Sequence, residues 1–287
     1  MILTGIEELQ KLLPSINLRL DSNRLDDFTL RAQQWVGDNI IGSDLEDILE
    51  IDILPNAPDD HEKLRLLVKR VIAAKAYLMF GDEMNLQLGE AGMVVQNNEA
   101  MSAASVQRRD NLMNSLEERL DCDCDALVNY LLKNSESSSA PYDYWRGTDQ
   151  FTYLTCAFTP TLKALKIGSP KGKNEGLHWE QFYGRLSNAD YDMVDLAGNY
   201  VSQEEIRRLR ELYRDHELTT VQYEAVASLR CVAAGIVADD RNFAIRAAIR
   251  VRDIMLANLG DFPCFASSDC VTLPDVSFNA GHIVDTL

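Results

Sequence analysis

Apolar side chains recur every three or four positions through much of the chain, and this spacing places them on one face of an α-helix. In the clearest stretch the face is formed by Leu64, Leu67, Val68, Val71, Ile72 and Lys75. Asp59 and Asp60 stand where this helix is predicted to begin, and Gly81 lies just past its predicted end. The same pattern elsewhere in the chain predicts a mainly α fold.

Four stretches in the first half of the chain match stretches of the second half in the same order. The matching pairs begin at Ile2 and Tyr153, Ala32 and Ala189, Ser43 and Ser202, and Arg70 and Arg230. Their separation grows smoothly from 151 to 160 residues, as expected of duplicated modules with small insertions. We therefore predict two tandem related helical modules, residues 1–133 and 152–262, with Ala73–Ala74 equivalent to Ala233–Ala234.

The first module contains a segment that the second lacks. The flanks NLQL and MVVQ enclose GEAG, a pattern that predicts a small β-hairpin near residues 86–96. Insertions in one copy of a duplication usually fall in loops, which often carry contacts. The hairpin is therefore either a contact element or a surface ornament.

Two further segments break the helical pattern. Serines and a proline mark residues 134–151 as a linker, and its aromatic cluster should dock onto another part of the protein. That cluster consists of Tyr142, Tyr144 and Trp145. Residues 263–287 lack a helical period and contain a turn-like Asn279-Ala280-Gly281, so a short β-like C-terminal arm is predicted.

Net charge excludes one class of function. The chain of 287 residues carries 45 acidic and 28 basic residues, a formal net charge of −17. Proteins that wrap nucleic acid gain affinity by neutralising phosphates with Lys and Arg, so tight nonspecific DNA binding is disfavoured. Two roles stay open for the acidic surface: solubility alone, or repulsion of DNA that passes beside it.

Targeting features are lacking in the sequence. No run of eighteen apolar residues occurs, so no transmembrane helix is expected. The opening MILTGIEELQ has acidic residues where a signal peptide carries basic ones, so we expect no export signal and a cytoplasmic protein. Its six cysteines are then expected to be reduced thiols, with Cys156 and Cys231 buried because their surroundings are apolar.

A calcium-binding motif begins at residues 121–125 but is not completed. The run Asp-Cys-Asp-Cys-Asp resembles the start of a calcium loop, yet Ala126 and Leu132 occupy the positions that require Gly and Glu. The run leads directly into the apolar ALVNYLL, so we expect these carboxylates to cap the helix that follows.

Other candidate ligands also lack partners. Neither the two cysteines of this run, Cys122 and Cys124, nor Cys264 and Cys270 have a second Cys/His pair at zinc-finger spacing. Glu175 and His178 have the spacing of a di-iron ligand pair, but no second pair exists. The sequence indicates no metal site.

Motifs for phosphate binding and acyl transfer are equally incomplete. Residues 168–173 resemble a phosphate-binding loop, but three residues rather than four separate the glycines, and Asn174 stands where Ser or Thr is required. No Gly-x-Ser-x-Gly elbow occurs. We therefore expect a protein without catalytic or cofactor-binding residues, not an enzyme.

From Leu25 to Lys133 the chain resembles the small helical head-to-tail connector, or neck, proteins of tailed phages and prophages. The resemblance rests on WVGDNIIG, the Ala-rich LRLLVKRVIAAKAYLMF, the strand-like LGEAGMVVQN and the helix opening MSAASVQRRDNLMNSLEERL. The doubled arrangement, with an arm ending FNAGHIVDTL, is similar to prophage proteins of Bacteroidetes-type gut bacteria. No individual functional residue is carried over by this likeness.

The resemblance implies a structural role in virion assembly. It implies a homo-oligomeric ring between portal and tail-completion proteins, with DNA passing through its lumen without tight binding. It also implies that the protein is made in the cytoplasm of a bacterial host and ends in the virion. Connectors of this kind usually have one module, so the second leaves the number of subunits open. Two alternatives remain: a bacterial helical protein-binding module without catalytic activity, and an enzyme with a dispersed site.

A DNA-lining surface would gather acidic side chains on one face. In the first module the candidates are Asp44, Glu46, Asp47 and Glu50. In the second, Glu204 and Glu205 begin the equivalent helix, but three arginines follow at Arg207, Arg208 and Arg210. We expect the first module to face a lumen more than the second.

Overall fold

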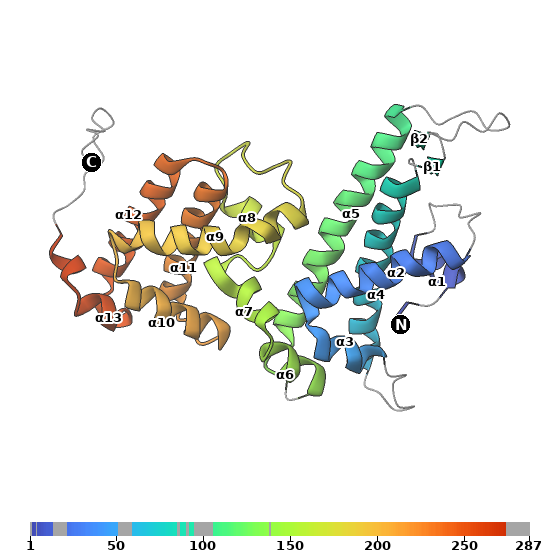
Figure 1. The fold of residues 1–287 in the computed structure, drawn as a ribbon. Coiled ribbons are helices and arrows are strands. Elements are labelled where there is room, and N and C mark those ends of the chain that lie inside the picture. The colour runs from blue at the N-terminus through green and yellow to red at the C-terminus, as the bar shows by residue number, and fades with distance from the viewer. Residues whose placement is uncertain are drawn as a thin grey trace. The chain divides into compact units, whose positions relative to one another are not determined.

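The computed structural model describes residues 2–3, 5–13, 22–50, 59–84, 87–89, 92–94, 106–137 and 139–273. Most of these residues are helical, which confirms the mainly α fold (Figure 1). They form two compact units. Unit 1 comprises residues 1–155, 159–163 and 176–184, and unit 2 comprises residues 156–158, 164–175 and 185–287. Of the helices in the described ranges, none combines the length and the apolar character needed to cross a membrane.

Unit 1 is built around two long helices. Its elements in chain order are α1 (Gly5–Leu12), α2 (Ser22–Val36), a π-helical turn η1 (Gly37–Ile41), α3 (Ser43–Glu50), α4 (Asp59–Met84), α5 (Val106–Lys133), α6 (Ala140–Arg146) and α7 (Asp149–Thr155). Helix α4 packs against both α2 and α5. Its predicted apolar face is confirmed, because Leu64, Val68, Val71 and Ile72 have no exposed surface.

Small residues on α4 are buried, and a glycine on the same helix lies against α5. Ala73, Ala74 and Ala76 are fully buried on α4. Gly81 lies inside α4 rather than past its end, which corrects the predicted boundary. A Cβ at Gly81 would come within 3.0 Å of the Met113 sulfur on α5, so the glycine serves helix packing instead of ending the helix.

Two short strands lie between α4 and α5. Strand β1 (Gln87–Gly89) pairs with β2 (Gly92–Val94) in an antiparallel register that sets Leu88 opposite Met93. They fall within the segment predicted as a hairpin, and they form the two-stranded sheet of the described residues.

The predicted linker at residues 134–151 is instead folded and belongs to unit 1. Its serines precede α6, a helix that buries Tyr142 and Trp145. The indole N–H of Trp145 donates a hydrogen bond of 2.8 Å to the backbone oxygen of Ile40 in the π turn. The expected docking of the aromatic cluster holds for these two side chains, whereas Tyr144 is half exposed.

Unit 2 is centred on the helix pair α11 and α12. The elements that follow α7 in the chain are η2 (Cys156–Phe158), α8 (Leu162–Gly168), α9 (Trp179–Gly198), α10 (Gln203–Arg214), α11 (Thr220–Val237), α12 (Arg241–Ala257), η3 (Leu259–Asp261), α13 (Pro263–Ala266) and η4 (Asp269–Thr272). The first residues of α8 and α9 belong to unit 1. Ala233, Ala234 and Gly235 are buried on α11, and a Cβ at Gly235 would come within 3.0 Å of the Ala244 backbone.

The described part of the predicted C-terminal arm is helical rather than β-like. Residues 263–273 form α13 and η4, and Phe265 is fully buried there. The expected turn at residues 279–281 lies outside the described residues.

The tandem duplication stays a prediction. Helices α2 to α5 and α9 to α12 follow each other in the same order, and Ala73–Ala74 and Ala233–Ala234 are buried on corresponding helices. However, α2 packs closely along α4, while α9 and α11 make no comparably close pair.

Candidate functional site

The acidic run at residues 121–125 lies in the middle of α5, so it does not cap the helix that contains it. It caps two later helices instead. Asp121 accepts hydrogen bonds of 2.6 Å from the Trp179 backbone N–H and 3.0 Å from the His178 ring. Asp125 accepts bonds of 2.9 and 2.8 Å from the backbone N–H groups of Leu162 and Lys163.

These contacts give two carboxylates of the calcium-like run a role in the fold. The carboxylates satisfy the free N–H groups at the starts of α8 and α9, which otherwise need a capping residue. Burial raises the pKa of Asp125, and the two backbone hydrogen bonds oppose that shift. His178, predicted as half of an incomplete di-iron pair, contacts Asp121 and lies 3.6 Å from Glu117, whereas Glu175 is exposed.

Burial raises the pKa of several cysteine thiols. All six are free. Cys124 is fully buried, and burial raises its pKa well above the ordinary value. Burial, with a smaller effect from Asp190, raises the pKa of Cys156 to about 12. Cys231 is half-buried, less than predicted, and its pKa is also raised by burial. Thiols whose pKa is raised are protonated and poorly nucleophilic at neutral pH.

The loop at residues 168–173 does not form a phosphate cradle. Gly168 is the last residue of α8, and it packs against the backbone of Arg230 on α11. Asn174 adopts a left-handed conformation, and its side-chain amide donates to the Ser169 hydroxyl and to the Ala234 backbone oxygen. The loop is therefore a fixed, exposed and basic turn.

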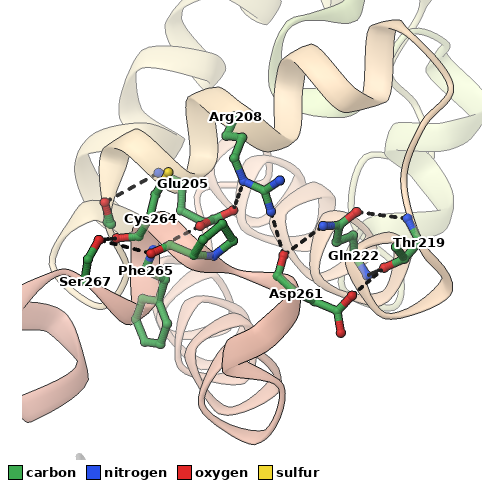
Figure 2. A network of polar contacts seen from close by, with 10 residues as sticks. Glu205, Arg208, Thr219, Gln222, Asp261, Cys264, Phe265 and Ser267 are labelled. Atoms are coloured by element: carbon green, nitrogen blue, oxygen red, sulfur yellow. Dashed lines mark hydrogen bonds and ion pairs between the residues drawn. The ribbon is translucent and has the colours of Figure 1, made fainter.

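A buried polar network that the sequence did not predict joins α10, α11 and α13 (Figure 2). Glu205 is fully buried and accepts hydrogen bonds of 2.8 Å from Arg208 and 3.0 Å from the Phe265 backbone N–H. The backbone oxygen of Asp261 accepts from Arg208 and from Gln222. Charged hydrogen bonds of this kind fix the geometry of the elements they connect.

This network corrects one expectation about surface charge. Glu205, predicted as part of an acidic face, contributes nothing to the surface, whereas its neighbour Glu204 is exposed.

Arg252, 3% exposed, donates to the backbone oxygen of Leu273 and holds the last described turn. Two buried charges thus anchor residues 261–273 on unit 2.

Unit 2 also contains an acidic cavity of about 380 Å³. Its charged walls come from Asp192 and Asp195 on α9 and from Asp239 and Asp240 in the turn between α11 and α12. Leu196, Ile236 and Ala244 contribute apolar lining, and Arg241 lies at the same cavity. A cavity lined by carboxylates and apolar side chains suits the cationic head and aliphatic stem of Lys or Arg. Across the described ranges, no group of three or more His, Cys, Asp or Glu side chains is arranged to hold a metal ion.

Comparison with known proteins concerns unit 1. Residues 22–154 match the model of a family described as a family of unknown function, DUF6712. The match runs from the start of α2 almost to the end of α7, so it includes the helices that replace the predicted linker. No curated protein and no solved structure matches the chain.

Sequence reasoning missed the acidic cavity because its residues come from distant parts of the chain. Asp239 and Asp240 are adjacent in sequence, but α9 brings Asp192 and Asp195 to them from over forty residues away. The signal available beforehand was the spacing of Asp192 and Asp195, which places two carboxylates on one face of a helix.

Proposed function

We propose that this chain is a structural head-to-tail connector, or neck, protein of a tailed phage or prophage, which assembles as a ring between portal and tail. The observation that carries the proposal is the order of elements in unit 1. A π turn, the short α3, the Ala-rich α4, the paired strands β1 and β2 and the long α5 follow one another. This is the order on which the resemblance to connector proteins rests.

The dimensions of these elements suit a load-bearing subunit. With 26 and 28 residues, α4 and α5 are each about 40 Å long at 1.5 Å per residue. They pack against each other, and Gly81 on α4 lies close to Met113 on α5. Two long packed helices with a pair of strands between them in the chain suit a subunit that contacts proteins above and below a ring.

The distribution of charge supports a lumen lined by the first half of the chain. Residues 1–133 contain 24 acidic and 13 basic residues, so they carry most of the net charge of −17. An acidic wall keeps DNA phosphates from binding as the DNA passes. Among the proposed lumen residues Asp47 is exposed, and the side chains of Asp44, Glu46 and Glu50 lie outside those described.

Two experiments test the assignment without imaging. The gene should lie among genes for portal, terminase and capsid proteins. The purified protein should co-sediment with the portal protein encoded there, and with tail-completion proteins once the portal is present. A neighbourhood without virion genes, or a portal that sediments alone, would count against the connector function.

A second function is favoured by one specific observation. The acidic cavity of unit 2, which also has apolar lining residues, supports a helical protein-binding module without catalytic activity that captures a basic segment of a partner. In that case a partner bearing exposed Lys or Arg should bind the isolated protein equally well with or without the portal.

A further inference from the structure

The two most exposed large hydrophobic side chains of the described residues stand in patches of opposite charge. Ile167 on α8 is 76% exposed, and Tyr191 on α9 is 75% exposed. Both belong to unit 2. Isolated apolar side chains at a surface are common, but an aromatic or aliphatic centre within a charged rim is the usual composition of an interface.

The basic patch consists of Ile167 with Lys166, Lys171 and Lys173. Residues 163–174 contain no acidic residue. The patch is held in one conformation, because the Lys173 backbone N–H donates to the Pro170 oxygen at 3.0 Å and Asn174 ties the loop to α11. A loop that is already ordered loses little conformational entropy on binding.

The acidic patch consists of Tyr191 with the four aspartates of the cavity. Tyr191 and Asp195 lie one helical turn apart on α9, so they share a face. Asp240 is the N-cap of α12 and accepts a bond of 2.9 Å from the Phe243 backbone N–H. The cavity of about 380 Å³ has room for a lysine side chain. Tyr191 adjoins the lining residue Asp192 in sequence, and an exposed tyrosine ring attracts a cation.

We propose that the basic patch of one copy of this chain binds the acidic patch of a second copy, with lysine side chains entering the cavity and Ile167 covering apolar surface beside Tyr191. The two patches are complementary in charge, and each supplies the apolar centre that the other would cover. The contact is head-to-tail, so each copy in a pair still has one free patch. Further copies can bind to these free patches through the same contact. The inference rests on the proposed function only for closure of that repeat into a ring.

Charge reversal with mixing tests the contact. In the first variant K171E and K173E are combined, and in the second D192K and D195K are combined. Matched controls shift the net charge equally at exposed positions of unit 1: K11E with K133E, and E118K with E136K. Sedimentation equilibrium at physiological salt measures association of the full chain.

The wild type and both controls should associate reversibly beyond the dimer. Each reversed variant alone should associate at least about tenfold more weakly, because like charges then face each other. An equimolar mixture of the two reversed variants should regain association, since each again finds an opposite patch. A monomeric wild type, an association that stops at the dimer, or a mixture that stays dissociated would overturn the proposal.

The portal experiment separates this inference from the proposed function. If copies associate through these patches but ignore the portal, the connector function fails and the contact stands. If the reversed variants still form rings on the portal, the contact is wrong and the connector function stands.

Discussion

The backbone N–H of Phe265 donates a hydrogen bond of 3.0 Å to the carboxylate of Glu205, a side chain with no exposed surface. The bond joins the short helix α13 to α10, which lies 60 residues earlier in the chain. Arg208, which bonds the same carboxylate, supplies the opposite charge that a buried glutamate requires. The described end of the chain is therefore held by a charged contact as well as by apolar packing.

Replacing Glu205 should destabilise unit 2. In E205A the Phe265 N–H and the Arg208 guanidinium both lose an acceptor, so the free energy of unfolding should fall by about 2 kcal/mol. Urea denaturation followed by circular dichroism measures the change. The neighbouring E204A, at an exposed position, should change stability by less than about 0.5 kcal/mol. Equal effects of both substitutions would contradict the role given to the buried carboxylate.

Asp125 should stabilise a helix that lies outside its own. D125A removes the acceptor for the first N–H groups of α8 and should lower the free energy of unfolding by about 1 kcal/mol, the usual value of a helix cap. D125N keeps one acceptor oxygen and should lose less. Replacing the exposed Glu118 on the same helix with alanine provides the control. If D125A and E118A behave alike in urea denaturation, the capping role is wrong.

Trp145 should be essential to the folding of α6 onto unit 1. W145F removes buried volume and leaves the Ile40 oxygen without its 2.8 Å donor, so a loss of about 2 kcal/mol is expected. Y144F, at a half-exposed position of the same helix, should be nearly neutral. Differential scanning calorimetry compares the two. A neutral W145F would restore the view of residues 134–151 as a linker.

These residues show what the sequence could and could not predict. The apolar faces of α4 and α11 were predictable because helical spacing alone determines them. Helix α6 was missed because serines before it indicate a linker, while burial of Trp145 depends on Ile40, 105 positions away. Glu205 was assigned to the surface for the same kind of reason, since a distant helix decides its burial. The acidic run was predicted to cap the helix that follows it in sequence, but its carboxylates cap α8 and α9 from the middle of α5. The sequence does not show that a helix cap comes from another helix.

Alkaline pH should destabilise the fold through Cys156. Its pKa is raised from 9.0 in the unfolded chain to about 12 in the fold, so the unfolded chain releases the proton first. The stabilisation is complete below pH 9.0 and is lost as the pH rises towards 12, at first by about 1.4 kcal/mol per pH unit. C156A should flatten this slope relative to C122A in stability measurements across that range. Parallel slopes would contradict the burial of the thiol.

All six cysteines should be thiols in the native protein. Alkylation of the unfolded, unreduced chain should therefore modify every one of them, as counted by mass spectrometry. In the folded protein the exposed Cys122 should react well before the buried Cys124 and Cys156. A native disulfide between any two would contradict the expectation of a cytoplasmic protein.

The isolated protein should not bind DNA at physiological salt. With 45 acidic and 28 basic residues, it lacks the surplus of Lys and Arg that nonspecific affinity requires. Fluorescence anisotropy of a labelled duplex measures this. Salt-sensitive binding would remove the argument for a lumen that lets DNA pass.

Electron microscopy of the protein mixed with the portal encoded by the same phage or prophage tests the connector function most directly. We predict a ring of additional density on one end of the portal, coaxial with its channel and formed by copies of this chain. Portal particles that look the same with and without the protein, while the protein stays separate in solution, would contradict the connector function.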